Sequence, residues 1–317
     1  MRVLVPADCP PEALGELPDG VDVVPWPLDA PPDVPPAEVA ALVLDPRYRE
    51  ALTGLLPALS GLRLVQTMNA GVDWVPPLPD GVTLARAGGV HEGPVAEWVL
   101  AAVLAMEKRL PHFLGEQAAG RWDASANLAF AADGPAAGDL AASTAVVVGM
   151  GAIGTAVAQR LRAFGTTVHG VTRSGRDGTA TPDALPRLLP GADVVVLLAP
   201  ATPDTAGLAD AAFLAAMKPG ALLVNAGRGA LVDTGALVDA LRSGRVRAAL
   251  DVTDPEPLPP GHPLWTCPGL LLTPHVAGSS PHWRQRAWRL AGEQLRRLAA
   301  GRPLEHVVAR RPAPAPA

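Results

Sequence analysis

Short apolar runs rich in β-branched residues alternate along this chain with segments of helical periodicity. We expect strands in an early series at residues 3–5, 21–24, 41–44, 62–65 and 82–84. We expect six further strands at residues 144–148, 167–171, 192–198, 221–224, 246–250 and 270–272. Strands separated by helices favour parallel sheets, because a parallel connection needs a crossover. The pattern therefore predicts an α/β protein with two parallel sheets.

Two longer segments predict long helices. One runs from Pro94 to Leu110, with proline at its first position and Pro111 after its end. It is apolar on more than one face, which indicates either an inter-domain connector or dimer contact, or burial within one subunit. The other spans residues 281–300 and precedes a Pro-Ala tail that we expect to be frayed.

Length and composition narrow the class of protein. With 317 residues the chain is long enough for two domains, and its net charge of −5 argues against nucleic acid or an anionic membrane as partner. Cys9 and Cys267 are the only thiols, which predicts neither a disulfide framework nor a metal site and favours a reducing, cytoplasmic compartment. The apolar stretch of residues 95–106 contains Glu97 and is too short to span a bilayer.

A glycine motif follows the strand expected at residues 144–148 and opens a helix. In this context Gly149 permits a tight turn, Gly151 lets a pyrophosphate approach the backbone, and Gly154 allows close packing of helix and strand. Ala152 and Ile153 would add the N–H groups of the helix N-terminus. The motif predicts a dinucleotide site; a purely structural glycine turn is the alternative.

The end of the next strand should set the choice of cofactor. An NAD site usually places an acid about 20 residues after the glycines, to bind the ribose 2′-hydroxyl. Here the chain has Thr172, Arg173 and Ser174, with no acid before Asp177. A guanidinium beside hydroxyls suits a 2′-phosphate. We predict NADP(H) as the preferred cofactor, with NAD(H) possible if Arg173 is only a solvated loop residue.

Three chemically active residues follow successive apolar runs late in the chain. Arg228, Glu256 and His275 each lie where an expected strand passes into a loop. Singly, they could be a loop cap, a turn acid and a core histidine. The carboxyl ends of parallel strands meet at one edge of a sheet, so their joint occurrence predicts a common site.

Several motifs together resemble a known family. They are Gln66-Thr67-Met68-Asn69-Ala70-Gly71-Val72-Asp73, the glycine motif and Thr273-Pro274-His275. In this order they resemble the D-isomer-specific 2-hydroxyacid dehydrogenases, in particular their glyoxylate/hydroxypyruvate reductase-like members. The resemblance covers nearly the whole chain.

The resemblance implies roles that agree with the chemistry of the side chains. Reduction of a 2-oxo acid needs a hydride on carbon, a proton on the carbonyl oxygen and a partner for the carboxylate. His275 would exchange the proton, Glu256 would orient the imidazole and favour its charged form, and Arg228 would bind the carboxylate and polarise the carbonyl.

The resemblance also implies the remaining site residues. The backbone of Asn69, Ala70 and Gly71 would receive the substrate carboxylate. Pro200 and Thr205 would flank the adenine side of the cofactor. Asp251 would lie near the nicotinamide carboxamide.

Together these observations predict two Rossmann-like or flavodoxin-like domains with an active-site cleft between them. A discontinuous substrate domain would comprise residues 1–93 and 281–317, and an NAD(P)-binding Rossmann domain residues 94–280. The expected activity is NADPH-dependent reduction of a small 2-oxo acid to the D-2-hydroxy acid, in a homodimer. A nucleotide-sensing binding protein of the same fold, or a specialised biosynthetic 2-keto acid reductase, are the alternatives.

Overall fold

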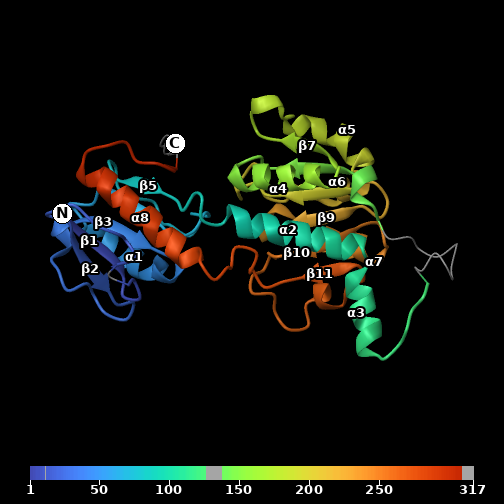
Figure 1. Cartoon of the computed structure of the whole chain (residues 1–317), viewed down its shortest axis with the longest axis horizontal. Coiled ribbons are helices and arrows are strands. Elements are labelled where there is room, and N and C mark those ends of the chain that lie inside the picture. The colour runs from blue at the N-terminus through green and yellow to red at the C-terminus, as the bar shows by residue number, and fades with distance from the viewer. Residues whose placement is uncertain (11, 126–137, 309–317) are drawn as a thin grey trace, which may run out of the picture. The chain divides into compact units, whose positions relative to one another are not determined.

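The computed structural model describes residues 1–10, 12–125 and 138–308 (Figure 1). The chain divides into two compact units. Unit 1 comprises Met1–His91 and Ser280–Ala317, and unit 2 comprises Glu92–Ser279. Each unit is built on a parallel β-sheet, as the alternation of strands and helices predicts. Among the described residues, no helix is long and apolar enough to cross a membrane.

Unit 1 contains a five-stranded sheet of order β2-β1-β3-β4-β5 in which every pair is parallel. All five apolar runs expected in this part of the chain form strands. The elements are β1 Arg2–Pro6, β2 Asp22–Trp26, β3 Val39–Leu44, α1 Arg49–Leu55, β4 Leu64–Thr67, β5 Thr83–Ala85 and α8 Trp283–Ala299. The strand order is the flavodoxin-like one.

Alternate residues of each strand in unit 1 enter different hydrophobic clusters. On β3, Ala41 and Val43 pack in the cluster that contains Trp288 of α8. Leu42 and Leu44 pack in the cluster that contains α1. Both faces of the sheet are therefore covered, which explains why the strands read as continuous apolar runs rather than as alternating patterns.

Unit 2 contains a six-stranded parallel sheet of order β11-β10-β9-β8-β6-β7. All six expected strands are present. They are β6 Thr144–Val148, β7 Thr167–Val171, β8 Val194–Leu197, β9 Leu222–Asn225, β10 Arg247–Leu250 and β11 Leu270–Leu272. A single parallel bridge from Val171 to Ala180 extends the sheet beyond β7. Counted with this bridge, the order is that of a Rossmann domain.

Helices cover both faces of this second sheet as well. The first face carries α2 and α4, and Val99, Val147 and Val157 share its cluster. The opposite face carries α5, α6 and α7, where Val146 and Phe213 pack together. The bounds are α2 Glu92–Glu107, α4 Ala152–Ala163, α5 Leu185–Leu188, α6 Ala211–Ala216 and α7 Thr234–Arg242.

The single helix expected from Pro94 to Leu110 is wrong in its extent. α2 ends at Glu107, Arg109 adopts a left-handed φ of 56°, and a separate helix α3 spans Leu110–Ala118. Pro111 lies in the first turn of α3, where a proline N–H is not needed, rather than beyond a helix end. Seven of the apolar residues of α2 are buried within unit 2, as one of the two interpretations predicts. They are Val95, Ala96, Val99, Leu100, Ala102, Val103 and Met106.

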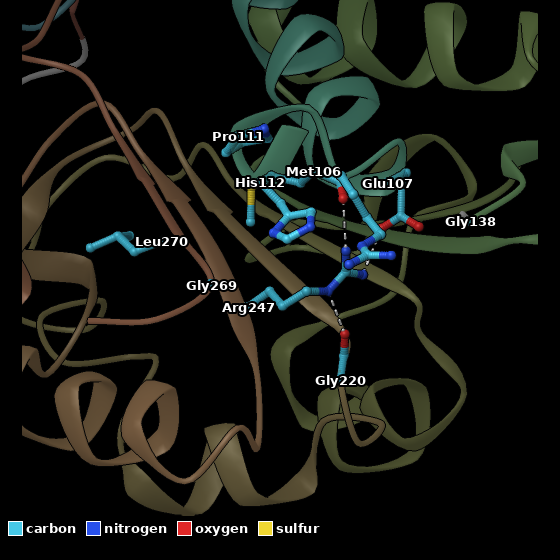
Figure 2. A pocket seen from close by; sticks show the side chains of 10 residues that line it. Met106, Glu107, Pro111, His112, Gly138, Gly220, Arg247, Gly269 and Leu270 are labelled. Carbon is cyan, nitrogen blue, oxygen red and sulfur yellow. Dashed lines mark hydrogen bonds and ion pairs between the residues drawn. The ribbon is translucent and has the colours of Figure 1, made fainter. Parts of the chain in front are cut away.

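One arginine fastens the end of α2 to the sheet (Figure 2). Arg247, the first residue of β10, donates through Nη1 to the Met106 carbonyl at 3.1 Å and through Nη2 to Glu107 at 2.7 Å. Its Nε donates to the Gly220 carbonyl at 2.9 Å. All three nitrogens are used, so this side chain joins the helix C-terminus to the amino ends of two strands.

The C-terminal segment is ordered further than expected. Gln294, fully buried on α8, donates to the Glu305 carbonyl at 2.6 Å and accepts from the Glu305 N–H at 3.0 Å. Val307 then forms an antiparallel bridge with Ala85 of β5. The predicted fraying is therefore wrong for this segment; residues 309–317 lie outside the described part of the chain.

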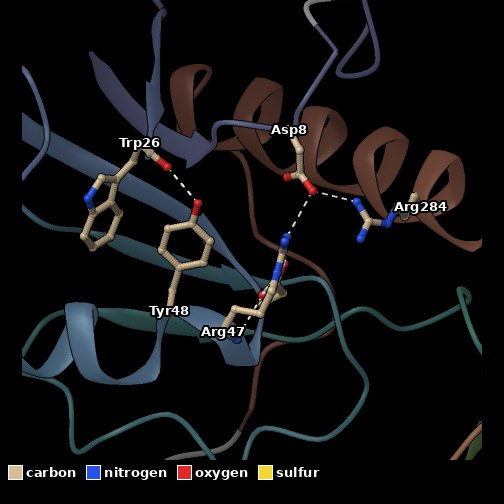
Figure 3. Close-up of polar contacts among 6 residues, drawn as sticks. Asp8, Trp26, Arg47, Tyr48 and Arg284 are labelled. Carbon is tan, nitrogen blue, oxygen red and sulfur yellow. Dashed lines mark hydrogen bonds and ion pairs between the residues drawn. The ribbon is translucent and has the colours of Figure 1, made fainter. Parts of the chain in front are cut away.

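A network of ion pairs joins the carboxyl ends of β1 and β3 in unit 1 (Figure 3). Arg47 binds Asp45 at 2.6 Å and Asp8 at 3.1 Å through Nη2. Arg284, near the start of α8, binds the same Asp8 oxygen at 2.6 Å. Asp8 therefore links both arginines, which come from segments far apart in the sequence.

This network predicts a pH-dependent contribution to stability. Burial raises the pKa of Asp8, but hydrogen bonds from Arg284 and Arg47 outweigh burial and lower this pKa below its ordinary value. A depressed carboxyl pKa stabilises the fold above the ordinary pKa near 4 and loses this effect as the pH falls further. Asp8→Asn should lower the urea midpoint at pH 7, and its difference from the unmodified chain should shrink below about pH 4.

Asp19→Asn is the matched control, because Asp19 is exposed and forms no hydrogen bond or ion pair within the described residues. It should leave the midpoint unchanged at both pH values. A difference between Asp8→Asn and the unmodified chain that stays constant from pH 7 to pH 3 would contradict the ionic role of Asp8.

Candidate active site

The structure brings two of the three predicted catalytic side chains into contact. Glu256 follows β10 and His275 follows β11, so both lie at the carboxyl edge of the unit 2 sheet. The Nδ1 atom of His275 and Oε1 of Glu256 are 2.5 Å apart. A carboxylate accepting from Nδ1 leaves Nε2 as the nitrogen available to a substrate.

A buried carboxylate holds the loop that carries this histidine. Asp251, 2% exposed at the end of β10, accepts from the Thr273 hydroxyl at 2.6 Å and from the Val276 and Ala277 N–H groups, each at 2.8 Å. The backbone N–H of His275 donates to the Asp251 carbonyl at 2.7 Å. Sequence reasoning missed this role, because the partners are more than twenty residues away along the chain.

The loop that carries Arg228 is held by Asn225, the last residue of β9. Asn225 is fully buried; its Nδ2 donates to the Arg228 carbonyl at 2.8 Å, and its Oδ1 accepts from the Gly227 N–H at 3.1 Å. Arg228 itself donates through Nη1 to the Gly227 carbonyl at 2.7 Å. No local sequence pattern predicts this role, and the contacts of Asn225 explain why the loop needs an asparagine.

The glycine motif takes the conformation that close approach requires. Gly149 has a φ of 102°, and a Cβ there would lie 2.5 Å from the Ala199 nitrogen. A Cβ at Gly154 would lie 2.1 Å from the Gly149 oxygen. At Gly151, by contrast, a Cβ would meet nothing within 4 Å. The first and third glycines permit backbone packing, whereas the second leaves space in front of the helix.

That space faces the N-terminus of α4. Gly151 is the N-cap residue of this helix, and in the described part of the chain no side chain caps it. The first-turn N–H groups of Ala152, Ile153 and Gly154 are therefore available to an anion, and the helix dipole favours negative charge there. Open space, unused N–H groups and a positive helix end fit the pyrophosphate of a dinucleotide.

The segment after β7 offers a cation and a hydroxyl to a further phosphate. Arg173 and Ser174 are exposed and form no hydrogen bond or ion pair within the described residues. Thr172 is engaged in its own turn, because its hydroxyl lies 2.7 Å from that of Thr179 and its N–H donates to the Ala180 carbonyl. Of the three residues predicted here, two are therefore free to bind a ligand.

Two further predicted cofactor residues lie in one loop after β8. Thr205 donates through Oγ1 to the Pro200 carbonyl at 2.6 Å and accepts from the Thr202 N–H at 2.8 Å. The hydroxyl thus fastens its own loop. The cofactor contact assigned to Pro200 and Thr205 stays a prediction.

The predicted substrate loop follows β4 in unit 1. The Asn69 carbonyl accepts from the Thr67 hydroxyl at 2.8 Å and from the Ala87 N–H at 3.0 Å, so the start of the loop is fixed. Ala70 and Gly71 follow and are partly exposed. Their contact with substrate stays a prediction, as does the cleft between the two domains.

The hollow drawn in Figure 2 lies at the other end of the unit 2 sheet. It encloses about 510 Å³ and is lined by Gly220, Arg247 and Gly269, at the amino ends of three strands. Ligands of open α/β sheets bind at the carboxyl ends. This hollow is therefore not the candidate active site.

Comparison with known proteins bears on both the fold and the site. Residues 100–277 match the family described as D-isomer specific 2-hydroxyacid dehydrogenase, NAD binding domain. A glyoxylate reductase from Thermofilum pendens is 33% identical over 93% of this chain and 90% of its own length. A glyoxylate reductase/hydroxypyruvate reductase from Mus musculus is 32% identical over 93% of this chain and 94% of its own.

Solved structures agree over almost the whole chain. A D-isomer specific 2-hydroxyacid dehydrogenase from Xanthobacter autotrophicus, in complex with NADPH and MES, is 32% identical with a TM-score of 0.81 and 98% of each chain covered. An NADPH-dependent glyoxylate/hydroxypyruvate reductase from Sinorhizobium meliloti, in complex with NADP and sulfate, is 29% identical with a TM-score of 0.78, covering 97% of this chain and 98% of its own.

The free guanidinium of Arg173 generates a prediction on cofactor choice. Arg173→Ala should weaken NADPH binding by about 10- to 100-fold, since a charge-assisted hydrogen bond contributes about 1.5–3 kcal/mol, and should change NADH binding little. Titration of both cofactors by fluorescence measures this. Arg187→Ala, at an exposed arginine on α5, is the matched control. Equal losses for both cofactors would exclude a contact with the 2′-phosphate.

Proposed function

The chain belongs to the D-isomer specific 2-hydroxyacid dehydrogenase family, and we propose that it reduces a small 2-oxo acid to the D-2-hydroxy acid with NADPH. It is thus a nicotinamide-dependent oxidoreductase. The observation that carries the proposal is the 2.5 Å contact of His275 with Glu256 at the same sheet edge as the glycine motif. Glyoxylate and hydroxypyruvate are the proposed substrates, because reductases of these acids match nearly the whole chain.

His275 supplies the proton in this reaction. The charged imidazole donates from Nδ1 to Glu256, which leaves the Nε2 proton for the carbonyl oxygen of the substrate. Bound NADPH supplies the hydride. The neutral imidazole left after reduction keeps its orientation. Glu256 accepts a hydrogen bond from its Nδ1–H group, and the Asp251 carboxylate binds the backbone of the loop. The reverse oxidation would use the same imidazole as base.

Arg228 binds the substrate in the proposed reaction. A guanidinium can donate two parallel hydrogen bonds to a carboxylate, a geometry that lysine does not reproduce. Asn225 holds the Arg228 carbonyl, which limits movement of the loop. The N–H groups of the loop after β4, at Asn69, Ala70 and Gly71, would bind the same carboxylate.

NADP(H) is the preferred cofactor, and NAD(H) can be accommodated. The open space at Gly151 and the uncapped start of α4 fit the pyrophosphate shared by both cofactors. Arg173 and Ser174 are free to bind the additional phosphate of NADP(H). Complexes of similar dehydrogenases with NADPH or NADP support this preference. A cytoplasmic location is proposed from the two isolated cysteines alone.

We also propose that the chain forms a homodimer through α3. The buried residues of α2 pack within unit 2, so the contact proposed here uses exposed leucines of α3. Leu110 and Leu114 on α3 are 48% and 62% exposed. Leu114→Glu should convert a dimer into a monomer, as measured by light scattering on a sizing column. Leu28→Glu, at a leucine of unit 1 that is 47% exposed, should leave the mass unchanged; a dimeric Leu114→Glu would exclude this surface.

The proposed reaction is tested by the absorbance of the reduced nicotinamide. Glyoxylate, hydroxypyruvate, pyruvate, phenylpyruvate and branched 2-oxo acids are offered with NADPH and NADH in parallel. Turnover of the first two with NADPH is expected. Turnover restricted to a larger 2-oxo acid would favour a specialised biosynthetic reductase, and tight NADPH binding without any turnover would favour a nucleotide sensor.

The role of the histidine is tested in the same assay. His275→Ala should lower kcat by about 10²–10⁴-fold, the usual contribution of a general acid, with NADPH binding unchanged. His169→Ala, at an exposed position of β7, should retain full activity. A His275→Ala enzyme within tenfold of the unmodified one would show that another group supplies the proton.

A further inference from the structure

Two loops of unit 2 approach each other more closely than side chains would allow. Gly229, in the loop after β9, lies against the peptide that joins Thr253 and Asp254 in the loop after β10. A Cβ at Gly229 would lie 1.9 Å from the Thr253 oxygen and 2.7 Å from the Asp254 nitrogen. Gly229 does not have a left-handed φ, so the close approach alone requires glycine here.

The next peptide of the same loop, between Asp254 and Pro255, is held from a second direction. Thr234, the first residue of α7, donates through Oγ1 to the Asp254 carbonyl at 2.8 Å. The helix start is itself fixed, because its N-cap residue Asp233 accepts from the Ala236 N–H at 3.0 Å. Two consecutive peptides of the loop after β10 are therefore fixed, one by Gly229 and the other by the N-terminus of α7.

These contacts lie next to two residues of the proposed site. Arg228 precedes Gly229 directly, and Glu256 follows Asp254 by two positions. His275 is held separately, because Asp251 binds its loop. The contacts at Gly229 and Thr234 therefore set the distance between Arg228 and Glu256.

We infer that Gly229 and Thr234 are positioning residues of the 2-oxo acid reductase, which fix Arg228 relative to Glu256. The inference rests on the proposed function for its effect on turnover, but its geometric content does not depend on that function. Neither residue needs to touch substrate or cofactor. Both act through the backbone that carries the two functional side chains.

Gly229→Ala tests the inference most directly. The added methyl must push the two loops apart, and a misplacement of about 1 Å can cost about 10²-fold in rate. We expect kcat/KM for the 2-oxo acid to fall by about 10²-fold, with both kcat and KM affected. NADPH binding should stay within about twofold, because the glycine motif and α4 are not involved.

Gly235→Ala is the matched control. It makes the same change six residues along the chain, where a Cβ would meet only Asp233 Oδ1, at an ordinary 3.4 Å. This variant should keep full turnover. Loss of NADPH binding in Gly229→Ala as well would indicate general damage to unit 2, and the Thr234 variants would then decide the inference.

Thr234 provides a second test that does not add volume. Thr234→Val keeps the shape of the side chain and removes the hydroxyl, and we expect kcat/KM to fall about 3- to 10-fold, as for loss of one hydrogen bond. Thr234→Ser keeps the hydroxyl and should restore kcat/KM to within about twofold. Equal activity of the valine and serine variants would contradict the positioning role, even if Gly229→Ala fails to fold.

Crystal structures of the unmodified chain and of Thr234→Val and Gly229→Ala separate this inference from the proposed function. The distance between the Cα atoms of Arg228 and Glu256 should increase in the variants. If the unmodified chain reduces no 2-oxo acid, the proposed function fails, but the distance still decides the inference. An unchanged distance would overturn it, whatever the activity.

Discussion

The carboxylate of Asp251 is the group on which the candidate site depends most. It is buried at the end of β10 and accepts three hydrogen bonds from the segment after β11. A buried carboxylate without donors would be strongly unfavourable, so these contacts must form when the sheet forms. They place the His275 backbone beside the end of β10, from which Glu256 also extends.

Much of this arrangement could be predicted from the sequence. Every expected strand is present, because strands buried on both faces require uninterrupted apolar runs that are easily recognised. Glu256 and His275 could be grouped because parallel strands end at one edge of a sheet, and the place of the Arg228 side chain beside them stays a prediction. The glycine motif could be placed because its strand and helix are both evident. Each of these predictions uses local patterns together with one rule of topology.

The contacts that hold the site could not be predicted in the same way. The position of Asp251 near the nicotinamide carboxamide stays a prediction. Its carboxylate binds residues 273, 276 and 277, which no local pattern associates with it. Gly229 is a glycine because of a peptide more than twenty residues later in the chain. Pro111 illustrates a different difficulty, because a proline can follow one helix or begin another, and spacing alone does not distinguish these cases.

The two sheets differ at the position where open α/β sheets bind their ligands. In each sheet this position lies beyond the two neighbouring central strands at which the strand order reverses. In unit 1 it lies beyond β1 and β3, and Asp8 and Arg47 join those strand ends by an ion pair. In unit 2 it lies beyond β6 and β8, where Gly149 packs against Ala199 and Gly151 leaves space before an uncapped helix.

This difference agrees with the match of unit 2 to the NAD binding domain of the family. A phosphate needs unused N–H groups and room for its oxygens, and the start of α4 offers both. At the corresponding position of unit 1, Asp8 would repel an anion, while Arg47 and Arg284 are already occupied with carboxylates. At this position ion pairs stabilise unit 1, whereas unit 2 keeps backbone N–H groups free. Two similar folds therefore acquire different functions from the residues that follow their first strands.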